Sequence, residues 1–332
     1  MFNEIILPAL LFIVCLAALI KGGDWFVDGA TGIAHRFHIP ELLIGATVVS
    51  IGTTLPEVMV SATSAFQGHG EIAYGNAIGS IICNTSLIAA LTVAIKPARV
   101  EKKSLVFPVI FFFAAAIVYS AIAYLFGDFR RIAGICLLIG FIVYMTTLVL
   151  QAKKEMSATA GADKSADTEA TEEKSSPMWK DILFLVIGAA LIAVGARLLV
   201  DNGTIIAKFL GVPESVIALT FVALGTSLPE LVTAITSLAK GHGALSLGNI
   251  IGANIFNLVL VSGVSIAISP FALPASSLIM GKNASLVMDI PVMFGVMMLL
   301  TLPALFKGKL YRWQGISLLC VYAAFCVIQF TL

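Results

Sequence analysis

Charged residues are scarce in this chain of 332 residues. Asp, Glu, Lys and Arg together make up 12% of the sequence, whereas 59% of the residues are hydrophobic and the mean hydropathy is +1.02. A typical soluble domain carries about 25% charged residues, so this composition predicts an integral membrane protein whose main partner is the lipid bilayer. The net charge of +1 argues against nucleic acid as a partner, and no obligate protein partner is evident.

The chain has few cysteines and lacks common enzyme motifs. The five cysteines lie in apolar stretches, so we expect small buried side chains and no disulfide framework or metal cluster. The sequence contains no HExxH motif, no Walker A motif and no nucleophile–histidine pair within its apolar segments, so we expect no enzyme activity and no cofactor. The N-terminus has Glu4 and no basic region, which predicts an uncleaved first span.

Ten apolar segments are present, each near the ~20 residues that a helix needs to cross a bilayer. We expect spans at about residues 4–22, 40–66, 71–95, 104–126, 131–151, 180–200, 213–239, 244–269, 285–306 and 310–331. The one long polar stretch, residues 152–178, contains no aromatic residue; the first one after it is Trp179. We predict that this stretch is a disordered linker. The halves on either side of it are residues 1–151 and 179–332.

The two halves repeat each other. A shift of 173 residues superimposes Gly22 on Gly195, Gly75-Asn76 on Gly248-Asn249, and the stretch 52–57 (GTTLPE) on 225–230 (GTSLPE). Matches that keep the same shift of 173 residues over such a long stretch indicate an internal duplication. Five spans per half make the second copy enter from the opposite side, so the predicted fold class is an all-α integral membrane protein with ten transmembrane helices as two inverted five-helix repeats.

Lys and Arg residues predict the orientation. Fifteen of them fall on the side of the linker and five on the other side. Because positive charge is enriched on the cytoplasmic side of membrane proteins, we expect the N-terminus outside and the linker in the cytoplasm.

The two repeated motifs are the candidate functional site. A carboxylate at mid-membrane depth costs roughly 2.5–3.5 kcal/mol, so Glu57 and Glu230 are functional candidates. Helical spacing places Ser50, Thr53, Thr54 and Glu57 on one face, and Ala223, Thr226, Ser227 and Glu230 repeat the pattern. Pro56 and Pro229 lack an N–H, which should leave the carbonyls of Gly52 and Gly225 free for another ligand.

The next span of each half adds amides to these motifs. Asn76, Ser80 and Asn84 recur every four residues, and Asn249, Ala253 and Asn257 repeat them. Carboxylate, hydroxyl, amide and free carbonyl oxygens suit a hard cation such as Ca²⁺ or Na⁺. Two nearby buried carboxylates without a cation should take up protons, so protons are expected to compete at low pH.

Both motifs resemble the two alpha-repeats of the calcium/cation antiporter superfamily, which contains the sodium/calcium exchangers, and look closest to the YrbG-type bacterial branch. The resemblance covers nearly all of both halves and implies alternating access, Ca²⁺ export in exchange for Na⁺, and a bacterial inner (plasma) membrane location. It also implies a cluster of cation sites, with Ca²⁺ held by Glu57, Glu230, Thr53 and Thr226, Na⁺ positions at Ser50, Thr54, Ser80, Ala223 and Ser227, and Asn84 and Asn257 flanking the centre.

Two positions depart from the family pattern. Asn257 stands where potassium-dependent members carry Asp, which argues against potassium dependence. Ala253 stands where a serine usually contributes to a sodium site, so the sodium stoichiometry is open. The acidic Gly-Asn-Ala-x-Glu motif that is usual in the proton/calcium branch is absent.

Three readings of the function compete with sodium/calcium exchange. A proton-coupled antiporter for Ca²⁺ or another divalent cation has the same fold. A cation channel needs ligand rings and a continuous pore, which the duplicated halves do not favour. An intramembrane enzyme is the least favoured, since its motifs are missing.

Overall fold

The protein was analysed as a computed structural model. The structure describes residues 2–97, 99–163, 177–210, 225–274, 278–279 and 281–331, and the following description is confined to them. It is almost entirely helical, as the sequence predicts. Eight of its described helices are long and apolar enough to cross a membrane, and they run over Ile5–Arg36, Glu41–Phe66, Gly70–Ile95, Lys102–Phe126, Arg131–Lys154, Met178–Phe209, Gly243–Ile268 and Ser285–Lys307.

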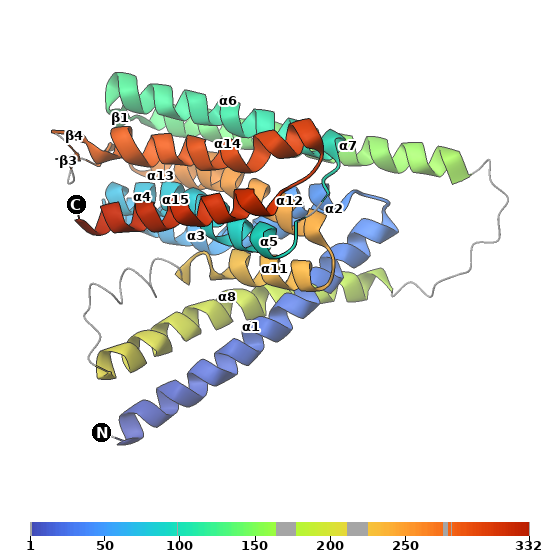
Figure 1. Cartoon of the computed structure of the whole chain (residues 1–332), viewed down its shortest axis with the longest axis horizontal. Coiled ribbons are helices and arrows are strands. Elements are labelled where there is room, and N and C mark those ends of the chain that lie inside the picture. Colours follow the sequence, from blue (N-terminus) through green and yellow to red (C-terminus); the bar gives the residue numbers. More distant parts are fainter. Residues whose placement is uncertain are drawn as a thin grey trace.

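Figure 1 shows the arrangement of the helices. In chain order they are α1 (Phe2–Arg36), α2 (Glu41–Ile44), α3 (Ser50–Phe66), α4 (Gly70–Cys83), α5 (Ala90–Ile95), α6 (Lys102–Phe126), α7 (Arg131–Asp163), α8 (Met178–Phe209), α11 (Leu228–Ala239), α12 (Gly243–Phe256), α13 (Ser262–Ile268), α14 (Ile290–Lys307) and α15 (Arg312–Thr331). Wider π-helical turns join several of them into continuous helices, namely η1 (Gly45–Val49), η2 (Asn84–Ala89) and η4 (Asn257–Val261), and a fourth, η5 (Ser285–Asp289), directly precedes α14.

Several predicted boundaries differ from the structure. The first span was expected to end at residue 22, but α1 continues to Arg36, and α8 likewise continues past residue 200 to Phe209. In the α1 extension the charged residues have partners on other elements, since Lys240 pairs with Asp24 and Asp28, and Asp181 pairs with Arg36. The predicted linker is helical over its first part, since α7 continues to Asp163; residues 164–176 lie outside the described part.

Two predicted spans are not among the eight apolar helices. The seventh, 213–239, begins in residues outside the described part, and its described portion forms the shorter helix α11. The tenth corresponds to α15, which is helical over Arg312–Thr331.

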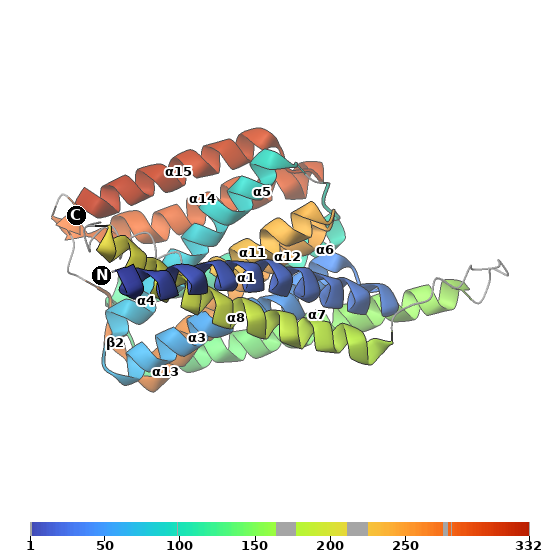
Figure 2. The same cartoon turned by 90° about the horizontal axis from the view of Figure 1, so that it is seen from below.

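α1 and α8 form a layer of their own (Figures 1 and 2). They run antiparallel: Gly22 lies against Gly188, Gly29 against Asp181, and Gly195 against Cys15 and Leu19. A side chain at Gly22 or Gly188 would collide with the other helix, so glycine permits this close approach. The pair packs on the main bundle through α11 and α3.

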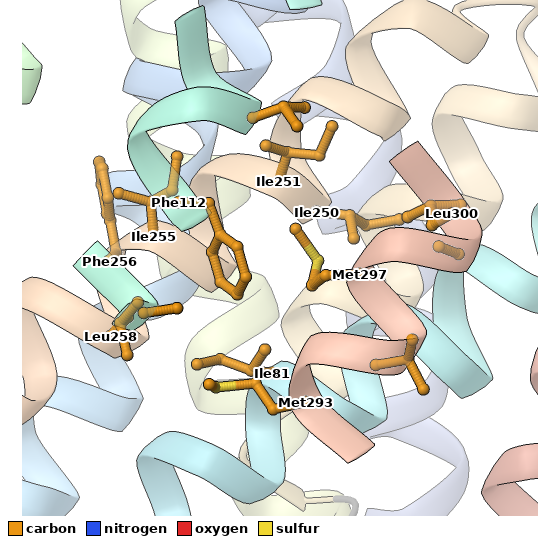
Figure 3. Close-up of a cluster of buried hydrophobic side chains, with 14 of the residues drawn as sticks. Ile81, Phe112, Ile250, Ile251, Ile255, Phe256, Leu258, Met293, Met297 and Leu300 are labelled. Carbon is orange, nitrogen blue, oxygen red and sulfur yellow. The ribbon is translucent and has the colours of Figure 1, made fainter. Parts of the chain in front are cut away.

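The main bundle is centred on α12, which is buried along its whole length. Helices α4, α6 and α14 surround it with apolar side chains (Figure 3). The labelled side chains of this core are Ile81, Phe112, Ile250, Ile251, Ile255, Phe256, Leu258, Met293, Met297 and Leu300. Two short antiparallel ribbons, β1 (Asp128–Phe129) with β2 (Phe271–Ala272) and β3 (Leu278–Ile279) with β4 (Lys282–Asn283), connect helix ends.

Candidate cation site

The first motif lies on the buried face of α3. Ser50, Thr53, Thr54 and Glu57 are all at most 2% exposed, whereas Ile51 between them is exposed. The helical spacing in the sequence therefore correctly predicted which side chains share a face. This face lies against α4 and α12, the helices that carry the repeated asparagines.

Glu57 and Glu230 are both completely buried, and their carboxylates are close enough to repel each other. Thr53 and Thr54 lie beside the Glu230 carboxylate, so the first motif faces the acid of the second. In the described part of the chain, neither carboxylate has a hydrogen-bond partner on either oxygen. Two buried acids without protein partners are costly, which is typical of groups that bind a cation.

The site also contains other polar atoms with no hydrogen-bond partner among the described residues. They are Thr54 Oγ1, Ser227 Oγ, Asn249 Nδ2 and both side-chain polar atoms of Asn84 and Asn257. Most buried polar side chains in folded proteins are satisfied internally. A group of unsatisfied oxygens around two carboxylates has the chemistry of a hard-cation site.

Asn84 and Asn257 occupy equivalent places in the two halves. Each is completely buried, and each begins a π-helical turn, η2 and η4 respectively, inside a long helix. A π-turn interrupts the regular hydrogen-bond ladder and is frequent at functional sites. The sequence predicted the two asparagines but gave no signal for the turns, which have no simple local motif.

The asparagines about two turns earlier, Asn76 and Asn249, connect the elements around the carboxylates. Asn249 Oδ1 accepts a hydrogen bond from Thr53 Oγ1 at 3.2 Å and lies 3.3 Å from Ser50 Oγ, so α12 is bound to α3 across the two halves. Asn76 Nδ2 donates to the backbone oxygen of Glu57 at 3.2 Å and to Ser61 Oγ at 2.8 Å. These contacts hold the backbone of the first motif against both neighbouring helices.

The second motif differs from the first. Pro56 lies inside α3, but Pro229 lies in the first turn of α11, where a missing N–H costs little. A turn separates Gly225 from α11, so the expectation that Pro229 leaves the Gly225 carbonyl free stays a prediction. Thr226 and Ser227 form the turn before α11, with Thr226 half-buried and Ser227 buried.

The structure gives less information on two other predicted site residues, Ser80 and Ala223. Ser80 is buried on α4, one turn before Asn84. Ala223 lies outside the described residues.

A cavity of about 1490 Å³ adjoins the two motifs. Gly52 and Pro56 line it from the first motif, and Gly225, Thr226 and Pro229 from the second. α8 forms the opposite wall, and the cavity includes Thr63 and Ser64 in the last turns of α3. It thus connects the neighbourhood of the carboxylates with the end of the molecule that lies away from the start of α8 (Figure 1).

One polar contact behind the site was missed from the sequence. Asn254 is completely buried; its Nδ2 donates to Thr85 Oγ1 at 2.7 Å and lies 3.2 Å from Met297 Sδ. Thr85 directly follows Asn84 in η2, so this contact fixes the backbone that carries Asn84. The repeat could not reveal it, because the counterpart of Asn254 is the apolar Ile81.

The donor set selects the kind of ion. Among the described residues, no group of three or more His, Cys, Asp or Glu side chains gathers to hold a metal. The buried motif offers two carboxylates with hydroxyl, amide and backbone oxygens, which favour Na⁺ and Ca²⁺ over thiolate- or imidazole-binding metals. The arrangement can hold one divalent or two monovalent cations at neutral total charge.

The long apolar helices are those of a polytopic membrane protein, and the buried acids between them are a candidate cation site. Two segments, 7–150 and 180–331, match the family model described as "Sodium/calcium exchanger protein". The chain belongs to this family, as the motifs suggested.

Named relatives cover nearly the whole chain. A "putative antiporter CaxA" of Alkalimonas amylolytica is 35% identical, over 98% of this chain and 99% of the relative. The "sodium/calcium exchanger MaX1" of Methanosarcina acetivorans is 30% identical, over 97% and 98%. The E. coli "inner membrane protein YrbG" is 36% identical over 80% and 81%. All are membrane proteins or transporters by name, in line with the expectation that the chain is not an enzyme.

A solved structure has the same fold. The sodium-calcium exchanger NCX_Mj, in crystals soaked with Na⁺ and Sr²⁺, superimposes with a TM-score of 0.78 at 33% identity, over 96% of this chain and 98% of that one. The fold of this chain is therefore that of a sodium/calcium exchanger.

Proposed function

We propose that this protein is a secondary antiporter that exports Ca²⁺ in exchange for Na⁺ by alternating access. The family and the fold support a cation/Ca²⁺ antiporter; the choice of Na⁺ as the coupling ion is our proposal. The observation that carries it is the pair of completely buried carboxylates, Glu57 and Glu230, without hydrogen-bond partners among the described residues and beside a cavity. Such a pair needs a cation of matching charge.

In the proposed site, Glu57 and Glu230 bind Ca²⁺ together with the backbone oxygens of Thr53 and Thr226. Ser50, Thr54, Ser80, Ala223 and Ser227 belong to the proposed sodium positions, and Asn84 and Asn257 flank the centre. The hydroxyls of Ser50 and Thr53 lie within hydrogen-bond distance of Asn249 Oδ1, which supports a role for Asn249 in positioning the first motif.

The proposed architecture consists of two inverted halves, 1–151 and 179–332, in a bacterial inner membrane with the N-terminus outside and the linker cytoplasmic. The antiparallel packing of α1 and α8, which begin the two halves, supports inversion. The paired matches of the family model, one in each half, support duplication.

Proton coupling is the second candidate, because one observation favours it. Ala253, at a sodium position of the family, is completely buried and has no side-chain oxygen to offer. Protons on the carboxylates would then compensate for the lost sodium ligand.

The deciding experiment is radioactive Ca²⁺ uptake into proteoliposomes. One set carries an imposed Na⁺ gradient, and a parallel set carries a pH gradient without Na⁺. Uptake that requires Na⁺ supports the proposal, whereas uptake driven by the pH gradient alone supports proton coupling. If neither gradient drives uptake, Ca²⁺ is the wrong substrate.

A further inference from the structure

Seven exposed Lys and Arg side chains gather on two loops that are about 200 residues apart in the sequence. One loop joins α5 to α6 and the other joins α14 to α15, at the end of the molecule where α8 begins (Figure 1). We call them the basic platform, formed by Lys96, Arg99, Lys102, Lys103, Lys307, Lys309 and Arg312.

Backbone contacts join the two loops. Arg99 and Lys309 form an antiparallel β-bridge, and the N–H of Val100 donates to the carbonyl of Gly308 at 3.0 Å. Lys102 Nζ donates to the carbonyl of Phe306 at 2.7 Å. Val100 and Leu310 are buried beneath them. Backbone contacts between the two loops therefore hold the cations close together, so the loops form one surface.

The platform lacks anionic partners in the described structure. None of its seven cations forms an ion pair there, although other Lys and Arg side chains such as Lys240 and Arg36 do. The only acid in the two loops is Glu101, whose Oε2 accepts a hydrogen bond from Ser104 at 3.3 Å. Crowded like charges repel each other, so an external anion would stabilise this arrangement.

Aromatic side chains place the platform at the depth of lipid headgroups. Trp313 is 52% exposed and Phe306 74% exposed, and both adjoin platform residues. Lys309 lies over the ring of Tyr311 at 5.4 Å. Exposed aromatics at helix ends are typical of the membrane–water interface, so the cations above them lie where phosphates of the bilayer lie.

We propose that the basic platform binds the headgroups of anionic phospholipids and joins the α5–α6 and α14–α15 loops through their phosphates. Orientation bias alone accounts for a surplus of positive charge on one side. It does not account for two distant loops that are hydrogen-bonded into one cationic surface with no carboxylate partner. Clustered Lys and Arg next to transmembrane helices attract the headgroups of anionic lipids.

The test compares two double variants of the full chain in detergent micelles. Arg99→Gln with Lys309→Gln removes two platform charges, and Lys153→Gln with Lys154→Gln removes two charges from α7. The midpoint of thermal unfolding is measured after addition of phosphatidylglycerol, phosphatidylcholine or free inorganic phosphate. We expect phosphatidylglycerol to raise the midpoint of the natural chain by about 2–3 °C more than phosphatidylcholine.

The platform variant should lose most of this difference, and the α7 variant should keep it. Equal midpoints of both variants in phosphatidylcholine would show that folding is intact. The proposal is overturned if the platform variant keeps the full response, or if the α7 variant loses it equally. A similar shift from inorganic phosphate alone would show that the platform binds free anions and not lipid.

Discussion

At the scale of single residues, the two buried acids decide the chemistry. We expect Glu57→Gln and Glu230→Gln each to reduce Ca²⁺ uptake by about tenfold to a hundredfold, because a contact to a charged group contributes about 1.5–3 kcal/mol. Glu71→Gln, which changes an exposed acid on α4, is the matched control. Near-normal uptake in either buried variant would refute the site.

The same variants should separate binding from folding. Without a cation, replacing a buried carboxylate by an amide removes a desolvation cost, so the thermal midpoint should stay equal or rise. Addition of Ca²⁺ should then raise the midpoint of the natural chain but not of the variants.

Ala253 tests the coupling ion. Ala253→Ser adds one hydroxyl next to the proposed centre and should make Ca²⁺ uptake depend more steeply on Na⁺. Ala253→Cys has a similar size but a poorer ligand for Na⁺, so it is the control for packing. An unchanged sodium response in the serine variant would exclude this position as a sodium ligand.

The sequence predicts which side chains of the candidate site share a buried face where neighbours along one helix define that face. Ser50, Thr53 and Glu57 share a face because of helical spacing alone, and the structure buries all three. It does not predict the contact of Asn249 with Thr53, nor that of Asn254 with Thr85, because each joins residues well over 100 positions apart. Those contacts depend on how the two halves pack.

At the scale of elements, glycines set how closely α12 approaches the first half. A Cβ at Gly248 would overlap the carbonyl oxygen of Leu42, and one at Gly252 would lie 2.6 Å from Ala46 Cα. This close packing brings Asn249 to the first motif.

Gly248→Ala should therefore destabilise the protein by about 1–3 kcal/mol, as overpacked substitutions do, and should lower uptake. Gly295→Ala on α14, where a Cβ meets no described atom within 4 Å, should be neutral or slightly stabilising. Thermal midpoints of both variants check this, and equal midpoints would mean that the packing adapts.

The sequence did not predict where α1 ends. Lys21, Asp24, Asp28 and Arg36 suggested that the first span ends near residue 22. α1 nevertheless continues, because Lys240 pairs with Asp28 at 2.8 Å and with Asp24 at 3.4 Å, and Arg36 pairs with Asp181 at 3.1 Å. Partners that distant leave no trace in local composition.

At the scale of the whole molecule, the two ends differ. The ion pairs of Lys240 join α1 to α11 at the end where α8 begins, while the lining of the cavity extends toward Thr63 and Ser64 in the last turns of α3. The repeat does not reproduce these ion pairs: the counterpart of Lys240 is Gln67, and that of Asp24 is Arg197. Among the described residues, Lys240 thus ties α1 to α11 through ion pairs that the repeat itself does not predict.

We predict that Lys240→Gln shifts the protein toward opening at the ion-paired end. Partly exposed ion pairs contribute about 0.2–1 kcal/mol each, so losing the two pairs of Lys240 should shift the equilibrium by about two- to thirtyfold. A thiol at Thr63→Cys in the cavity, in a chain without its native cysteines, should then react more slowly with reagent from the cavity side. Lys154→Gln is the control, and an unchanged rate for Lys240→Gln would contradict the prediction.

The glycine-lined contact between α1 and α8 has a mechanical consequence. The backbones of α1 and α8 touch at Gly22 and Gly188, and Arg36 and Asp181 join the two helices near one end. The pair therefore moves as one rigid body. A rigid pair of helices that rocks over the main bundle cannot move away from the bundle at both ends at the same time. Leakage of ions through a fully open path would then be prevented by rigidity itself, without any residue that senses the state of the opposite side.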